Sequence, residues 1–206
     1  MVLGQRRRLA FIAVVVLVGA FGGLALQRTL SGKSKAPFAG WVNGIYIYPD
    51  ASNAPAGFVP DKTAAPDPVC PGQSVRVVSE DELKASGSYI DIPAWMPPET
   101  VEQEAISGGA CGTKIVVVSR QFQIGSYGAL IGLLFYPGAR SASFPAVAQQ
   151  VHAITVNGRR AVAIKPLTDD GAGNSAIFIL TDKGLLQVGA YGVRFADLRR
   201  VAESIK

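Results

Sequence analysis

The chain has 206 residues, of which about 180 follow an N-terminal apolar run and are enough to form one sizeable core. Its formal charge is +5, with 20 basic against 15 acidic side chains. Without the three arginines at positions 6 to 8, 17 basic residues remain and the net charge is +2, spread without a cluster. This balance argues against nucleic acid as a partner, because such binding needs a basic face.

The first element is the apolar run Leu9–Leu26, which follows the three arginines directly and contains no charged side chain. At a helical rise of about 1.5 Å per residue it covers roughly 27 Å, close to the thickness of the hydrocarbon core of a bilayer. We therefore predict a cytoplasmic tail at 1–8, a transmembrane signal anchor at 9–26 and a tether at 27–39. A cleaved signal peptide is the alternative, since Gly23 and Ala25 are the small residues that a signal peptidase needs. Either outcome exports the remaining chain.

The orientation of the anchor rests on cysteines more than on flanking charge. Arg28, Lys33 and Lys35 after the run equal in number the arginines before it, so the positive-inside bias is nearly balanced. Cys70 and Cys111 are the only cysteines, and an even count in an exported chain predicts a structural disulfide. We therefore expect a cell-membrane protein whose bulk, residues 40 to 206, forms one extracytoplasmic domain.

The first part of that domain mixes short regular pieces with loops. Gly40–Pro49 alternates isoleucine and tyrosine and predicts a strand, entered through an Asn43-Gly44 turn. Asp50–Pro71 is rich in proline and predicts a long irregular loop. Val75–Val78 is a short apolar piece.

A short helix and an extended segment follow. Ser79 and Glu82 have the spacing of a capping box, which predicts a helix start, and Gly87 predicts its end. Ile90–Pro98 contains three prolines and is expected to run extended, with Trp95 and its neighbour Met96 packed as a plug. Nearby, Glu102 and Glu104 are expected on a solvated face and receive no role.

From residue 113 onward the pattern predicts an antiparallel meander with tight turns at Asn157-Gly158 and Thr181–Gly184. The final stretch, Phe195–Ile205, has an apolar helical face, so a C-terminal helix should cover the sheet. The fold class expected is therefore α+β. The predicted strands are Lys114–Phe122, Ala129–Tyr136, Val151–Val156, Arg160–Lys165, Ala176–Thr181 and Leu185–Tyr191.

Three short motifs carry a resemblance to a known family: IPAWMPP at 92–98, VNGRRAV at 156–162 and FADLRRVAESI at 195–205. In this order they resemble an uncharacterised extracytoplasmic domain of bacterial single-pass membrane proteins, including anti-sigma-factor-like ones, over about Tyr89–Ile205. The resemblance implies no catalytic residues. Only Met1–Arg8 precedes the apolar run, so no cytoplasmic domain that holds a sigma factor is expected.

Candidate chemistry is sparse. Cys111 could be a nucleophile within a glycine-rich turn, with the single histidine, His152, as its base, but such a Cys–His hydrolase requires Cys70 to remain unpaired. One histidine and two cysteines cannot assemble a zinc site. Asp169–Ser175 offers oxygen ligands but lacks the closing glutamate of an EF-hand loop, and predicts a plain hairpin loop. We therefore predict no catalytic residue, no metal and no cofactor.

The sequence thus favours a non-catalytic binding, sensory or accessory module whose partners are the membrane and another protein. The alternative is a carrier of a lipid or other apolar ligand, because the apolar, glycine-containing strands around Ile124–Tyr136 could line a groove. A filled layer between sheet and helix favours the interaction module, and a large dry cavity there favours the carrier.

Overall fold

The computed structural model describes residues 40–47, 59–60, 74–103, 105–126, 128–140, 150–166, 168 and 173–206. The predicted tail, anchor and tether, most of the proline-rich loop, and Cys70 lie outside these ranges. Among the described residues, no helix has the length and apolar character needed to cross a membrane.

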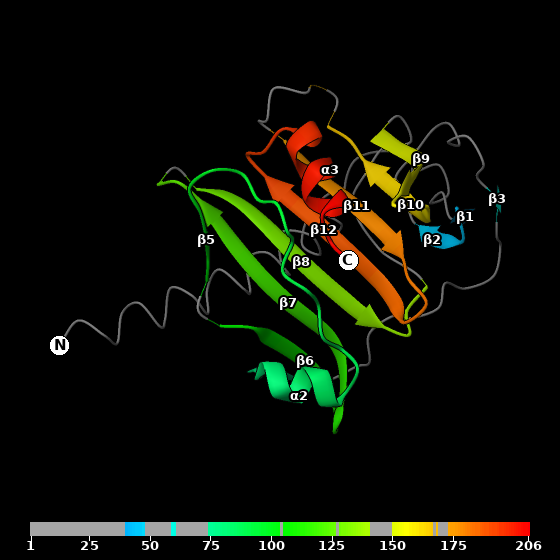
Figure 1. Cartoon of the computed structure of the whole chain (residues 1–206). Helices are drawn as coiled ribbons and strands as arrows, with labels where there is room; N and C mark the ends of the chain where they lie inside the picture. The colour runs from blue at the N-terminus through cyan, green and yellow to red at the C-terminus, as the bar shows by residue number, and fades with distance from the viewer. Residues whose placement is uncertain are drawn as a thin grey trace, which may run out of the picture.

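A nine-stranded antiparallel sheet forms the body of the fold (Figure 1). Its strands lie in the order β4-β6-β7-β8-β12-β11-β10-β9, and β5 pairs with β7 as well. This arrangement confirms the predicted α+β class with an antiparallel sheet and a C-terminal helix. The strands are β4 Ser74–Val77, β5 Thr100–Glu102, β6 Ser107–Cys111, β7 Lys114–Ile124, β8 Ala129–Pro137, β9 Val151–Val156, β10 Arg159–Ile164, β11 Asn174–Leu180 and β12 Gly184–Tyr191.

A second, three-stranded sheet has the order β2-β1-β3, with β1 at Gly40–Val42, β2 at Ile45–Ile47 and β3 at Val59–Pro60. Asn43 and Gly44 join the first two strands with φ values of 52° and 78°, the left-handed pair that a type I′ turn requires. The predicted strand over residues 40 to 49 is therefore divided into a hairpin at the predicted turn.

In the described part of the chain, two helices cover one face of the large sheet. Helix α2 (Glu80–Ala85) begins at Ser79, whose Oγ accepts from the N–H of Glu82 at 3.2 Å. The reciprocal half of the capping box is absent, since the Glu82 carboxylate pairs with Arg76 instead. Helix α3 (Phe195–Glu203) lies across β11 and β12, and α2 lies at the distant end of the sheet beside β6 (Figure 1).

The two faces of the large sheet carry separate clusters of buried side chains. The predicted apolar face of α3 is buried against the sheet, with Phe195, Leu198 and Val201 at most 8% exposed. On the opposite face, Val42 and Ile45 of the small sheet pack onto β9 to β12. The layer between the sheet and α3 is therefore filled by side chains.

The predicted plug is confirmed as a packing element. Trp95 is half-buried against the core, its backbone N–H donates to the hydroxyl of Ser204 at 3.1 Å, and the Arg200 guanidinium lies 4.2 Å from its ring centroid. Asn157, in the predicted hairpin turn, donates from Nδ2 to the carbonyl of Glu203 at 2.7 Å. These contacts join the end of α3 to the segment around Trp95 and to the turn between β9 and β10.

Candidate functional site

Strands β5 and β6 act as one interrupted strand along β7. Both run antiparallel to β7, with Glu102 opposite Phe122 and Ser107 opposite Ser119. The register of the ladder shifts between these pairs, because five steps along the sequence lead from Glu102 to Ser107 and only three from Ser119 to Phe122. We call this register shift the bulge.

Strand β4 covers the outer side of β6 and stops at the bulge. The N–H of Val78 donates to the carbonyl of Ile106 at 3.0 Å, and the chain then leaves the sheet to begin α2. In the part of the chain that the structure describes, β5 pairs with β7 and with no other strand, and it lies along the margin of the sheet (Figure 1). An added strand beside β5 would continue the line of β4.

The outward backbone groups of β5 follow from the register of the ladder. The N–H of Gln103 donates to the carbonyl of Gln121 at 2.9 Å. Because bonded and non-bonded pairs alternate along an antiparallel ladder, Val101 faces β7, whereas the N–H and C=O groups of Thr100 and Glu102 face outward. These groups form the free edge of β5.

Three exposed valines line the same margin of the sheet. Val75, Val77 and Val101 are 46%, 59% and 67% exposed. The cross-strand pairs connect each valine, through β6 where that strand lies between, with a residue of β7 whose side chain points away from α2. Paired residues point to the same face of a sheet, so the three valine side chains lie on the face opposite the helices. We call these three residues the valine row.

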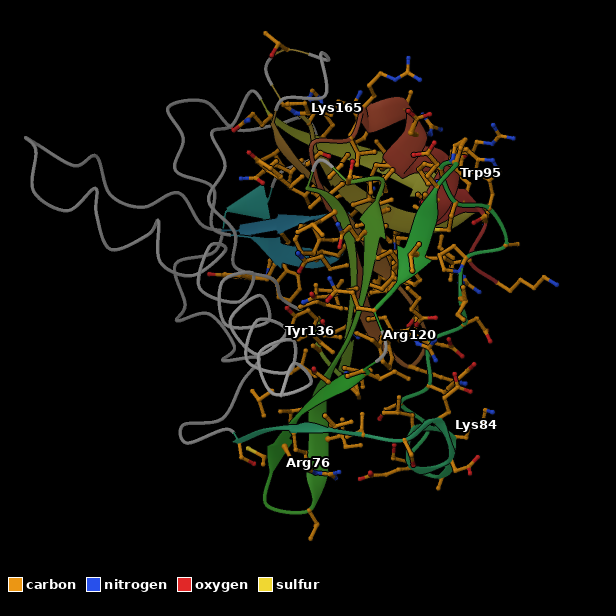
Figure 2. The ribbon with its side chains drawn as sticks, turned by 90° about the vertical axis from the view of Figure 1, so that its left-hand side faces the viewer. Arg76, Lys84, Trp95, Arg120, Tyr136 and Lys165 are labelled. Carbon is orange, nitrogen blue, oxygen red and sulfur yellow. The ribbon has the colours of Figure 1, made fainter. Side chains whose placement is uncertain are left out.

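A buried arginine lies on the other face of the sheet, beneath α2. The Arg120 side chain is 1% exposed; its Nη1 donates to Glu102 Oε1 at 2.9 Å and its Nη2 to Glu80 Oε1 at 2.8 Å. Its guanidinium also lies 5.4 Å from the ring centroid of Tyr89. In Figure 2, Arg120 lies on the side of the sheet that faces α2, whereas Tyr136 lies on the opposite side.

The ion pairs shift the pKa values of Glu80 and Arg120. The hydrogen bond from Arg120 holds the pKa of Glu80 below its ordinary value, and Lys84 lies 3.5 Å from the second oxygen of that carboxylate. Burial lowers the pKa of Arg120, but the bond to Glu80 and the charge of Glu102 outweigh that effect, so its pKa is raised. Both shifts favour the charged forms of Glu80 and Arg120.

An open cavity of ≈ 370 Å³ lies where β4 ends and the bulge begins. Its lining includes the apolar residues Val77, Val78 and Ile106 and the charged residues Glu80, Glu102 and Arg120. The Nε of Arg120 is buried and has no hydrogen-bond partner among the residues that the structure describes. The cavity adjoins the end of the free edge of β5, because Glu102 belongs to both.

The hypothetical Cys–His pair is not assembled. Cys111 ends β6 and His152 belongs to β9, six strands away in the sheet, which corresponds to about 29 Å at the usual strand spacing. Cys111 is disulfide-bonded, and no cysteine in the described ranges is free. The predicted partner, Cys70, lies outside those ranges, so the pairing stays a prediction.

The structure does not place most of the candidate calcium loop, since residues 169–172 lie outside the described ranges. Where the structure describes the chain, no group of three or more histidine, cysteine, aspartate or glutamate side chains is arranged to hold a metal ion.

Sequence reasoning missed the Arg120 cluster and assigned Glu102 to a solvated face. Glu102 instead faces the core side and accepts from Arg120, and Glu104 lies outside the described residues. One signal was present: Arg120 occupies the alternate positions of β7 that also carry Val118 and Phe122, so the strand pattern places a charge on an apolar face. Such a residue needs acidic partners.

Comparison with known proteins identifies no relative: no family model matches the chain, and neither a curated protein nor a solved structure matches it. The resemblance to an extracytoplasmic domain therefore remains an expectation from the sequence motifs.

Proposed function

We propose that the chain is a non-catalytic, membrane-anchored extracytoplasmic binding module. In this proposal it binds an extended segment of a partner protein, which adds as a strand beside β5. The anchor in the proposal rests on the length and position of Leu9–Leu26.

The observation that carries the proposal is the free edge of β5. An edge strand with unpaired N–H and C=O groups is a template for another chain. Here the outward backbone groups of Thr100 and Glu102 lie beside the exposed valine row. Backbone hydrogen bonds would supply affinity in strand addition, and the valines would supply apolar contacts.

A protein partner is favoured over a carried apolar ligand. The layer between the sheet and α3 is occupied by Phe195, Leu198 and Val201 packed against side chains of β11 and β12. That packing supports the interaction module, because a carrier would need a dry cavity in this layer. Ligand sites have volumes on the order of several hundred Å³.

The test uses the full chain in a mild detergent and peptides selected from a phage-displayed random library. Each selected peptide is resynthesised with N-methyl groups on one of its two alternating sets of backbone amides. Methylation of the set that faces β5 should weaken binding by at least about tenfold, since it removes two or more hydrogen bonds worth about 1 kcal/mol each. Methylation of the other set should leave affinity unchanged.

Two results would contradict the proposal. One is equal tolerance of both methylation patterns, which would mean that the peptide does not bind as a strand. The other is a peptide-independent dimer of the chain that buries β5, which sedimentation equilibrium would detect.

A further inference from the structure

We infer that the cavity beside β5 takes a lysine or arginine side chain of the added strand, so that the module selects segments in which a basic residue alternates with apolar ones. The inference rests on the proposed function and adds its specificity. The partner is thus a protein with an exposed, extended, basic-apolar segment.

The register of an added strand divides its side chains between two surroundings. Residues directly opposite each other in a sheet point to the same face. The partner residue opposite Val101 therefore contacts the valine row, whereas the partner residue opposite Glu102 points to the face that carries Arg120 and the cavity. The first position favours an apolar side chain.

The groups that an incoming side chain can reach determine which charge is favoured on the partner residue opposite Glu102. Arg120 is fully buried, and both of its terminal nitrogens already donate to carboxylates. The carboxylates of Glu80 and Glu102 are 45% and 32% exposed and stand between Arg120 and solvent. An incoming cation meets these carboxylates first, and an incoming anion is repelled by them.

Each carboxylate retains accepting capacity. Glu102 gives Oε1 to Arg120, and its second oxygen has no hydrogen bond or ion pair to any described residue. Among the described residues, the second oxygen of Glu80 is paired with the exposed Lys84 alone, at 3.5 Å. A lysine or arginine head group can therefore bind here without displacing Arg120.

The shape of the cavity suits a long basic side chain. Its volume of ≈ 370 Å³ lies near the lower limit for ligand sites, and it is open rather than enclosed. Val78 and Ile106 form apolar lining on which the methylene stem of a lysine or arginine can lie, while the head group stays at the carboxylates of Glu80 and Glu102.

Arg120 serves this site as a positioning residue. It holds the carboxylates of α2 and β5 in one orientation, although these elements lie far apart in sequence. The carboxylates are therefore preorganised before a partner arrives, which reduces the ordering cost of binding.

The experiment compares three peptides that differ only at the residue opposite Glu102: lysine, norleucine or glutamate, in a selected strand-binding sequence. Binding to the full chain in detergent should follow the order lysine, norleucine, glutamate, with lysine on the order of tenfold tighter than glutamate. Glu102→Gln and Glu80→Gln should each weaken the lysine peptide and reduce the difference between lysine and glutamate. The norleucine peptide should bind these variants as it binds the wild type.

Glu203→Gln is the matched control, because Glu203 is an exposed carboxylate on α3 that pairs with Arg199. It should leave all three affinities unchanged. Circular dichroism melting of each variant identifies any loss of fold. Equal affinity for lysine and glutamate, with the N-methyl pattern still observed, would overturn the inference and leave the strand-binding function standing. Loss of the N-methyl pattern would overturn the proposed function itself.

Discussion

Arg120 and Glu80 are joined across 40 residues of sequence by a hydrogen bond of 2.8 Å from Nη2 to Oε1. The bond ties α2 to the middle of β7, and the bond from Nη1 to Glu102 ties β5 to the same guanidinium. One buried side chain therefore orders both elements that border the cavity.

The role of Arg120 can be separated into packing and pairing. Arg120→Ala should lower the free energy of unfolding by about 2–4 kcal/mol, because it creates a cavity and removes both pairs. Arg120→Met should recover most of that loss, since methionine fills the space and leaves two carboxylates that water can still reach. Urea denaturation measures both values. Equal losses in the two variants would show that pairing, not packing, dominates.

Acid should weaken the contact between α2 and the sheet. The pKa of Glu80 is lowered from 4.5 in the folded protein by the hydrogen bond from Arg120, so the pair stabilises the fold above the unfolded pKa. That contribution is lost as the pH falls through the lowered folded value. The difference in melting temperature between wild type and Glu80→Gln should therefore be constant near neutrality and shrink below pH 4.5. A difference that grows on acidification would contradict this assignment.

Two glycines with unusual backbone angles should differ in their tolerance of alanine. A Cβ at Gly184 would lie 2.3 Å from the carbonyl oxygen of Tyr136, whereas a Cβ at Gly158 would meet nothing within 4 Å. Gly158→Ala, at φ 75°, should cost only the left-handed strain of about 1–2 kcal/mol. Gly184→Ala should cost more, because the backbone of β8 must move. Thermal unfolding of the two variants tests the order, and a milder effect at position 184 would contradict it.

The disulfide of Cys111 should be an important stabilising bond. If Cys70 is its partner, closing the loop stabilises the fold by about 4 kcal/mol on the chain-entropy model. Proteolysis of the non-reduced protein followed by mass spectrometry should recover a peptide pair linked through these two residues. Recovery of an unmodified Cys70 thiol would refute the pairing, and a reductant that left the melting temperature unchanged would refute its importance.

Local sequence patterns predicted the elements whose signals lie within one short stretch of the chain. The strand Val151–Val156 and its turn follow from alternation and from the Asn157-Gly158 pair, and α3 follows from its apolar face. In contrast, β6 was not predicted, because Ser107–Cys111 contains two glycines and an alanine, which have little strand propensity. Its pairing with β4 and β7 is a tertiary effect that no short window contains.

The candidate site was hidden for the same reason. Glu80, Glu102 and Arg120 come from a helix, a short strand and a long strand, and only the sheet order brings them together. Alternation along β7 could reveal that Arg120 points into a core. It could not identify which acidic residues accept hydrogen bonds from Arg120. It also could not show that β4 stops early and leaves β5 with a free edge.

Amide hydrogen exchange by NMR is the most direct test of that free edge. With the selected peptide bound to the full chain, the amides of Thr100 and Glu102 should become strongly protected, because they face outward and would donate to the added strand. The amide of Val101, which already faces β7, should change little. Unchanged exchange at Thr100 and Glu102 in the saturated complex, with protection elsewhere, would contradict strand addition at β5.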